Sequence, residues 1–398
     1  MAPDRDRLLA TVEALQAIDR PPASPGERRA AEWIRDALAA AGVDARLEEE
    51  PATGSFAVPV ALLSAAGAVA GLSRRGRLVP ALAGLAATAG IADDVSGGAH
   101  WFRRTALPRR LTTNVVGELG DPGARETVIF VAHHDAANAG LVFHPGPSRF
   151  VADAFPAWYD RQETSPPLMR LVVAGPALAG LGALLGRRRL RRAGGAAALL
   201  AALAVGEIAA RPVVPGANDN LAAVAVLLEL ARVLRAEPPD GVRVILLSTG
   251  AEESFMEGMR GFVARHRAGL DPARTRVVVL ECVGGPEPIV LEGEGMLRIR
   301  DYTPDTRDWL AAAGDRAGHP LRRGLRSGFA TDALISLNAG LPTAVLAAID
   351  AYKLAPNYHS PRDVAAELHL GTVAACVEIC AAAVRSLRLS APPAPAPA

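Results

Sequence analysis

The chain has few aromatic residues, few cysteines and almost no net charge. Aromatic residues make up 4% of its 398 residues, and three cysteines are too few for a disulfide framework. The 43 Lys and Arg residues balance 42 Asp and Glu residues, which gives a formal net charge of +1. This balance creates no global field that favours nucleic acid, so we expect no nucleic-acid partner.

A secretory leader and general disorder are also not indicated. Residues 1–20 carry charges throughout and contain no continuous apolar stretch, so we expect no cleavable signal there. Half of the residues are hydrophobic, which is enough for one large core or two ordinary ones. Cys376 and Cys380 lie four residues apart in an apolar helical segment and are predicted to be core residues.

Short apolar runs alternate with helical patterns through most of the chain. Ser24, Pro25 and Glu27 form a capping-box pattern at the start of a helix that would end near Gly42. Another helix would follow Asp219, and a terminal helix would follow residue 362. Strands are expected at 43–49, 114–119, 127–132, 242–248, 276–280 and 344–347. This alternation predicts a three-layer αβα domain with a mostly parallel mixed sheet.

Four apolar segments interrupt this pattern as two helical hairpins with basic tips. The segments are 56–72 and 78–92 in the first hairpin, and 171–185 and 194–210 in the second. At about 1.5 Å per residue they reach roughly 25 Å, somewhat short of the ~30 Å hydrocarbon core of a bilayer. Either the hairpins pack as a soluble helical cap or their faces contact lipid. We expect membrane association, with a cytoplasmic location as the alternative; the side of the membrane stays open.

A histidine and two aspartates stand where predicted strands or turns end. In His133-His134-Asp135, the functional hypothesis gives His133 to a metal ion and lets Asp135 hold its other ring nitrogen. Asp219 follows a Gly/Asn/Pro turn and could bridge two metal ions through its two oxygens. The alternatives are a polar strand end for the first motif and helix capping for Asp219.

Three more acids and a histidine complete the candidate site. Glu252 and Glu253 directly follow a buried strand, where unpaired negative charge is costly without cations or protons. Glu253 would ligate a metal ion and Glu252 would accept the proton of the attacking water, whereas a solvated acid pair is the alternative. Glu281 ends another apolar strand, and His359 lies in a turn before the last helix.

The order His-x-Asp, Asp, Glu-Glu, acid, His resembles the family of di-zinc aminopeptidases that includes bacterial leucyl aminopeptidases and glutamate carboxypeptidase II. The resemblance covers roughly residues 1–50, 112–140 and 214–388. It implies two Zn²⁺ ions per chain, one bound by His133 and Glu281 and the other by Glu253 and His359. It also implies that Asp219 bridges both ions, that Glu252 is the general base, and that Asp135 orients His133.

The sequence departs from the family pattern at three places. Glu281 replaces an aspartate that is usual there, and Asn220 stands where a second aspartate is common. The segment between His133 and Asp219 carries the second apolar hairpin where the family usually needs a short loop. None of these changes removes an implied ligand.

We therefore expect a zinc-dependent exopeptidase that removes N-terminal residues from peptides with a free N-terminus. Its catalytic domain would comprise residues 1–55, 106–145 and 212–388, with hairpin inserts at 56–105 and 146–211 and a disordered Pro/Ala tail at 389–398. One alternative is single-zinc amide chemistry such as glutaminyl cyclisation. The other is a non-catalytic membrane scaffold on a peptidase fold.

Overall fold

A mixed sheet forms the centre of the computed structural model, which describes residues 2–73 and 76–390. Its strand order is β1-β2-β4-β3-β5-β10-β6. The four inner strands β4, β3, β5 and β10 run parallel, and the remaining neighbours pair antiparallel. The strands are β1 (Asp44–Ala52), β2 (Arg110–Gly120), β3 (Glu126–His133), β4 (Val242–Thr249), β5 (Thr275–Glu281), β6 (Glu287–Val290) and β10 (Thr343–Ile349).

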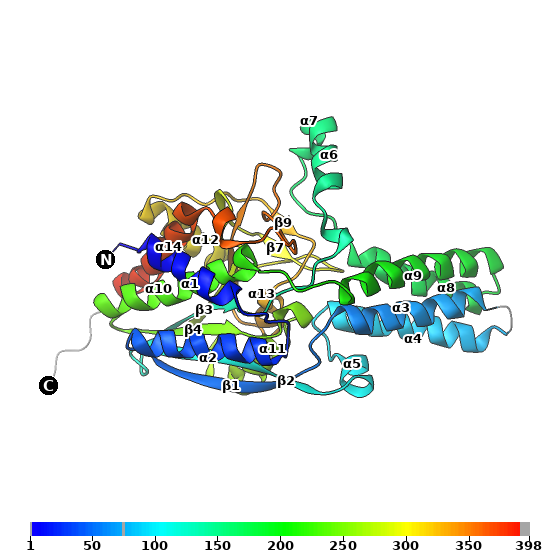
Figure 1. Cartoon of the computed structure of the whole chain (residues 1–398), viewed down its shortest axis with the longest axis horizontal. Helices are drawn as coiled ribbons and strands as arrows, with labels where there is room; N and C mark the ends of the chain where they lie inside the picture. The colour runs from blue at the N-terminus through cyan, green and yellow to red at the C-terminus, as the bar shows by residue number, and fades with distance from the viewer. Residues whose placement is uncertain (1, 74–75, 391–398) are drawn as a thin grey trace.

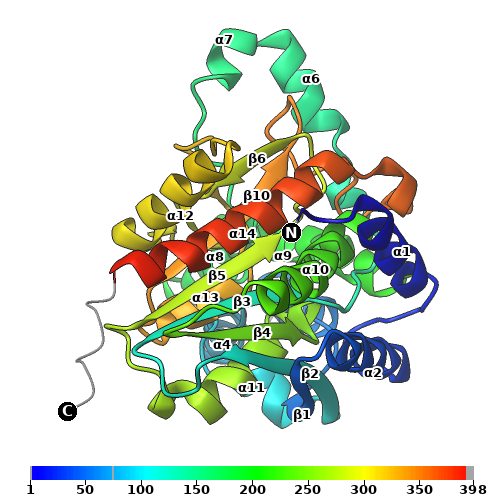
Figure 2. The ribbon, with the colours of Figure 1, turned by 90° about the vertical axis from the view of Figure 1, so that its left-hand side faces the viewer.

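Helices cover both faces of the sheet and enclose two hydrophobic cores. The first core lies under α1 (Arg5–Gln16), α2 (Pro25–Ala40), α10 (Ala222–Ala236), α12 (Pro304–Ala317) and α14 (Leu370–Ser390). The second lies under α11 (Glu257–His266), α13 (Asp332–Asn338) and the bases of the inserted helices. Figure 2 shows α10, α12 and α14 on the same side of the sheet. These layers confirm the predicted three-layer α/β fold.

Some predicted boundaries differ from the structure. The terminal helix α14 begins at Leu370, because residues 365–367 form a separate short turn of 3₁₀ helix. It ends at Ser390, and the rest of the expected tail, 391–398, lies outside the described residues, as do Arg74 and Arg75 of the first hairpin tip. The two-residue strands β7 (Gly293–Glu294), β8 (Arg300–Asp301) and β9 (Arg326–Ser327) form a small second sheet, too short to show periodicity in the sequence.

The capping box at the start of α2 is only half formed. Ser24 Oγ accepts the backbone hydrogen bond of Glu27, as the pattern predicts. The Glu27 carboxylate, however, accepts from the backbone N–H of Ala23 at 2.7 Å instead of returning to the cap residue. It is drawn inward because Thr112, Thr113 and Ala251 also donate to it.

The two inserted hairpins pack against each other as a four-helix bundle that projects from the α/β body, here named the stalk (Figure 1). Three of its helices are longer than the sequence predicted, α8 by a single residue. The stalk helices are α3 (Ala57–Leu72), α4 (Leu78–Val95), α8 (Met169–Leu184) and α9 (Arg188–Ala209). Both hairpins therefore leave and re-enter the body at the same end.

Small residues line the inside of the stalk, and large apolar side chains face outward. A Cβ atom at Gly71 would lie 2.3 Å from the Gly195 Cα, and one at Gly84 would lie 2.7 Å from the Gly180 backbone nitrogen. On the outside, Val69 is 72% exposed and Leu200 is 69% exposed. The stalk thus reverses the usual arrangement of a water-soluble bundle, which buries its large apolar residues.

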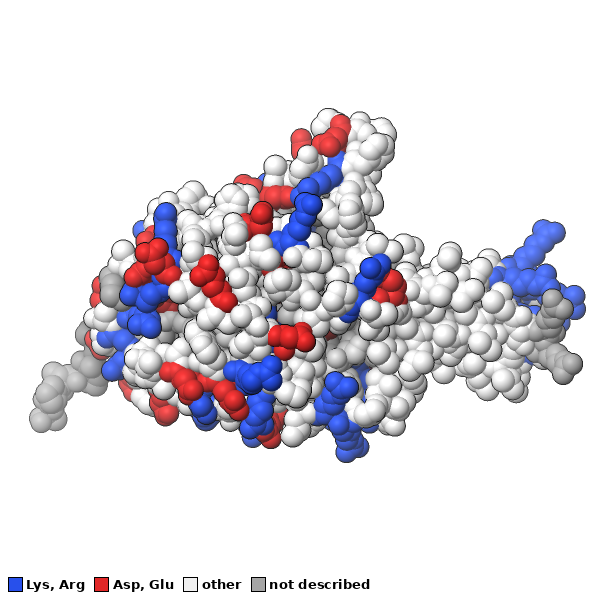
Figure 3. Space-filling view, in the orientation of Figure 1, with Lys and Arg blue, Asp and Glu red and all other residues white. Residues whose placement is uncertain are grey.

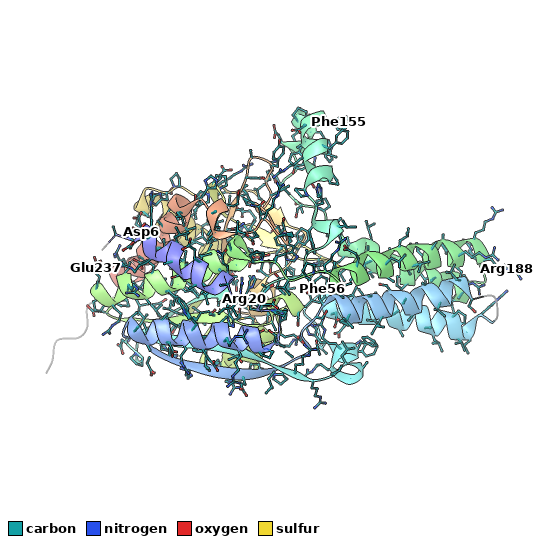
Figure 4. The ribbon with its side chains drawn as sticks, viewed as in Figure 1. Asp6, Arg20, Phe56, Phe155, Arg188 and Glu237 are labelled. Carbon is teal, nitrogen blue, oxygen red and sulfur yellow. The ribbon has the colours of Figure 1, made fainter. Side chains whose placement is uncertain are left out.

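Charged residues are confined to the two ends of the stalk. The ranges 57–73, 78–92, 171–186 and 193–206 contain no Asp, Glu, Lys or Arg. Arginines gather at the tip, among them Arg188, while the visible middle of the stalk is free of charged side chains (Figures 3 and 4).

Candidate metal centre

The predicted site residues converge at the carboxyl edge of the parallel strands. His133 ends β3, and Glu281 ends β5. Glu252 and Glu253 lie in η3 (Glu252–Ser254), just beyond the end of β4. Asp219 lies in η2 (Ala217–Leu221), directly ahead of α10. His359 comes from the loop that precedes α14.

Asp219 lies between the two histidines. Its Oδ1 is 3.1 Å from His133 Nε2, and its Oδ2 is 3.2 Å from His359 Nε2. His359 Nε2 is also 3.2 Å from Glu253 Oε1. Glu281 Oε1 is 3.9 Å from His133 Nε2 on the other side. The carboxylate of Asp219 therefore presents one oxygen to each histidine.

These distances fit a pair of zinc ions. Two ligand atoms at about 2.0–2.1 Å from one tetrahedral zinc are separated by roughly 3.3 Å. Asp219 Oδ2 and His359 Nε2 are buried and make no hydrogen bond of good geometry with any residue that the structure describes. A cation between such atoms would satisfy both of them.

Asp135 contacts both His133 and the glutamate pair. Its Oδ1 is 3.3 Å from His133 Nδ1. Its two oxygens also accept the backbone hydrogen bonds of Glu252 and Glu253, at 3.1 and 3.0 Å. Asp135 is fully buried, so one carboxylate connects the end of β3 to the segment that follows β4.

Burial and charge crowding shift the pKa values of the site. Burial raises the pKa of Glu252 well above its usual range, and the neighbouring Glu253 charge adds to this effect. Burial lowers the pKa of His359, but Glu253 and Asp219 outweigh it and raise the value to about 10. For His133, burial is likewise outweighed by Asp135, Asp219 and Glu281, and the pKa rises well above its usual range.

Several supporting residues were not predicted from the sequence. Asp363 accepts the backbone hydrogen bonds of Asn218 and Asp219 at 2.7 and 3.0 Å and so fixes the η2 turn. Arg20 is fully buried and donates to the backbone carbonyls of His134 and Gly216. Both side chains bind backbone groups next to the site. Contacts of this kind have no recognisable motif in the sequence, so they could not be predicted from it.

Asn220 and Cys282 lie beside Glu281. Asn220 donates to the Leu280 carbonyl at 2.8 Å and accepts from the Cys282 backbone N–H at 3.1 Å. The Cys282 thiol donates to Glu281 Oε1 at 3.2 Å. An amide suits this position because it both donates and accepts, which an aspartate could not do.

The stalk base contacts both sides of the site. Phe143, in η1 (Leu141–Phe143) ahead of the second hairpin, places its ring centroid 4.2 Å from that of His359. Arg103 in α5 (Trp101–Ala106) forms a fully buried ion pair with Asp94 of α4, at 3.0 Å, and donates to the Ser254 carbonyl. The inserts are therefore packed against the segments that carry the candidate ligands.

A parallel-stranded α/β core with converging acids and histidines is the arrangement expected of a zinc metallopeptidase. More particularly, residues 204–384 match the model of Peptidase family M28. This match confirms the predicted resemblance to di-zinc aminopeptidases.

Curated relatives share only a short segment with the chain. The mouse and rat proteins described as endoplasmic reticulum metallopeptidase 1 are each 42% identical over 53 residues. That segment is 13% of this chain and 6% of either relative, so the chain matches a small part of their length.

Solved structures share the fold over almost the whole chain. A glutaminyl cyclase from Bacteroides thetaiotaomicron has a TM-score of 0.58 and 14% identity, and the match covers 97% of this chain and 99% of that one. An aminopeptidase from Aneurinibacillus sp. strain AM-1 has a TM-score of 0.55 and 14% identity, with 96% and 93% covered. A leucine aminopeptidase precursor from B. thetaiotaomicron has a TM-score of 0.55 and 15% identity, with 97% and 98% covered.

Proposed function

We propose that the protein is a two-zinc aminopeptidase that removes N-terminal residues from peptides and is anchored to a membrane by its stalk. The position of Asp219 carries the enzymatic part of the proposal, because each of its oxygens faces a different histidine. A carboxylate in this position suits two cations a few ångströms apart.

His133, Glu281 and Asp219 would hold one zinc ion, and His359, Glu253 and Asp219 the other. When bound, the ions would activate a water molecule, polarise the scissile carbonyl and anchor the free α-amine of the substrate. Glu252 would act as the general base, accepting a proton at its carboxylate and passing it to the leaving amine. Its raised pKa suits this role, since a base must also release the proton.

Metal analysis and substrate blocking together test the enzymatic proposal. We expect about two zinc ions per chain, hydrolysis of aminoacyl fluorogenic substrates, and loss of hydrolysis with a chelator. Acetylation of the substrate N-terminus should abolish cleavage, because the α-amine is then uncharged and blocked. Cleavage of the acetylated substrate at the unblocked rate would contradict the exopeptidase assignment.

The second candidate function is glutaminyl cyclisation on a single zinc ion. It is supported by the similarity of the fold to that of a glutaminyl cyclase. It predicts one zinc ion per chain and release of ammonia from peptides with N-terminal glutamine. The complete set of five candidate ligands supports the two-zinc peptidase instead. The same filled set argues against a non-catalytic scaffold.

The membrane part of the proposal is supported by the reversed stalk. Helices α4 and α9, of 18 and 22 residues, are long and apolar enough to cross a membrane. At ~1.5 Å per residue these helices reach about 27 and 33 Å. Their charge-free ranges 78–92 and 193–206 reach about 21–23 Å, so in a ~30 Å hydrocarbon core the arginines that begin α9 would extend toward the headgroups. The terminal helix α14 has similar length and hydropathy, but it packs on the sheet.

Close glycine contacts inside and large apolar residues outside are typical of helix packing in lipid. The tip arginines would then reach lipid phosphates. We expect the full-length protein to float with phosphatidylcholine and phosphatidylglycerol vesicles in a density gradient, and to stay bound at high salt. A detergent-free monomer that does not float would exclude the anchor.

A further inference from the structure

The most exposed aromatic side chains of this aromatic-poor chain lie in its two inserts, on opposite sides of the stalk base (Figure 1). Among the described residues, the most exposed aromatics are Phe150 (70%), Phe155 (60%), Trp158 (55%) and Trp101 (43%). All four lie within the inserts. Phe329, at 37%, is the exposed aromatic outside this group.

These residues come from two elements at the base of the stalk. Trp101 begins α5, which directly follows the stalk helix α4, and its ring packs near Gly90 of that helix. The other three lie on an arm formed by α6 (Gly146–Ala154) and α7 (Pro156–Tyr159), which precedes the stalk helix α8. The arm extends sideways from the body, roughly perpendicular to the stalk, with Phe155 near its end (Figures 1 and 4).

The arm is fixed to the body although its aromatic residues are exposed. Lys353, the single lysine of the chain, donates to the backbone carbonyls of Tyr159, Asp160 and Gln162 at 2.9–3.1 Å. Tyr159 Oη donates to the Tyr352 carbonyl at 2.6 Å. These contacts hold the arm in a defined position, and they hold Phe150, Phe155 and Trp158 with it.

Basic side chains accompany the aromatic residues. Arg104, Arg109 and Arg110 are exposed in and after α5, the helix that Trp101 begins. Tryptophan and phenylalanine next to arginine are typical of the layer between lipid headgroups and acyl chains. Exposing three large aromatic side chains to water on one short arm is unfavourable, and such exposed apolar groups often mark an interaction site.

We infer that α5 and the α6–α7 arm form an aromatic collar that lies in the headgroup layer of the bilayer that takes the stalk. This inference rests on the membrane anchor proposed above. The collar sets the depth of the stalk from one end, while the arginine tip sets it from the other. It also places the metal centre close to the membrane surface, since Phe143 and Arg103 join the stalk base to the site.

Tryptophan quenching by brominated lipids tests the collar in the full-length protein bound to phosphatidylcholine and phosphatidylglycerol vesicles. Bromines near the headgroup end of the acyl chains should quench more strongly than bromines near the chain ends. The quenching should disappear in W101F/W158F. It should persist in W33F/W309F, the matched control, because Trp33 and Trp309 lie on α2 and α12 of the body.

The possible outcomes separate the collar from the anchor. Flotation without quenching that depends on Trp101 and Trp158 overturns the collar and leaves the anchor standing. No flotation overturns both, and hydrolysis of soluble substrates is then still measurable on its own. If the control variant fails to fold, the comparison of the natural protein with W101F/W158F still decides, since both substitutions are at exposed positions.

Discussion

Asp135 holds the backbone of Glu253 through a 3.0 Å hydrogen bond from the Glu253 N–H, and it holds Glu252 in the same way. A single buried carboxylate therefore positions the proposed base and a proposed ligand, besides facing His133. This relationship extends the role predicted from the sequence, in which Asp135 acts on the histidine alone.

Asp135→Asn should weaken zinc binding and catalysis together. The amide keeps the size of the side chain but replaces one acceptor oxygen by an NH₂ group, which would face an N–H or the His133 ring. Loss of such a supporting contact costs about 10- to 100-fold in metal affinity or activity. Zinc titration and kcat measure this, with the exposed Asp121→Asn as control. Unchanged zinc affinity would show that Asp135 has no positioning role.

Glu252→Gln and Glu253→Gln should have different effects although the residues are adjacent. The first should leave zinc content unchanged and lower kcat by about 10²–10⁴-fold, because glutamine cannot accept the proton. The second should lower zinc content, because Glu253 faces His359 at 3.2 Å as a candidate ligand. Metal analysis of both purified variants beside kcat separates the roles. Substantial turnover in Glu252→Gln would refute its assignment as the base.

The candidate site residues could be singled out from the sequence because each follows a strand or a turn, and the structure brings them together. His133, the glutamate pair and Glu281 stand directly after continuous apolar runs, and parallel strands bring such positions to one edge. The sequence did not predict Arg20 or Asp363, which act on backbone groups far away in the chain. Glu27 fitted a local capping pattern, whereas its contacts with Thr112 and Ala251 depend on the tertiary structure.

The stalk, too, could be predicted from the sequence only in part. Its four apolar segments were evident from the sequence, but their reversed packing depends on which glycines meet. The arm could not be predicted as a fixed element, since α7 has four residues and no periodicity. Its position follows from Lys353, almost two hundred residues away.

Glu294 should make stability depend on pH. It is fully buried, and burial raises the pKa of its carboxyl from the ordinary value of 4.5 to about 8. A raised folded-state pKa means that the folded protein binds the proton more tightly, so this contribution is complete below about pH 4.5 and is lost as the pH rises toward 8. The free energy of unfolding should fall by up to about 1.4 kcal/mol per pH unit in this window.

Glu294→Gln should make the slope shallower by the share of Glu294, because glutamine stays neutral while other buried carboxyls with raised pKa values, such as Glu27, remain. Denaturant unfolding of the natural protein, Glu294→Gln and the half-exposed Glu287→Gln at pH 5, 6, 7 and 8 provides the measurement. The Glu287 variant should keep the natural slope. Equal slopes in all three proteins would exclude a neutral Glu294 in the folded state.

Gly71→Leu should loosen the stalk. A Cβ at this position would lie 2.3 Å from the Gly195 Cα, so the helices must move apart. Overpacking of this kind costs about 1–3 kcal/mol. The melting temperature in detergent should fall, whereas Val69→Leu, an exposed position on the same helix, should leave it unchanged. If both variants melt like the natural protein, α3 and α9 do not pack at the glycines.

Lys353→Met should free the arm while the stalk stays folded. An ammonium group has three N–H donors, and here each one meets a different carbonyl at the end of α7. Methionine keeps the apolar stem but donates nothing, so all three carbonyls lose the ammonium group; the Tyr159 carbonyl keeps the Gln162 N–H as a donor. Each decrease of ~1.4 kcal/mol in the free energy of opening the arm should raise its open population about tenfold. Hydrogen exchange of residues 156–162 should therefore accelerate by at least that factor.

Arg385→Met is the matched control, because Arg385 pairs with the exposed Glu237 and lies on α14. Exchange in the arm should stay at the natural rate in this variant. The Lys353 variant should also float with vesicles like the natural protein, since the stalk helices are unchanged, but shallow quenching of Trp158 should weaken. An arm that exchanges at the natural rate without Lys353 would mean that other contacts fix it, and the lysine would then have no part in positioning the collar.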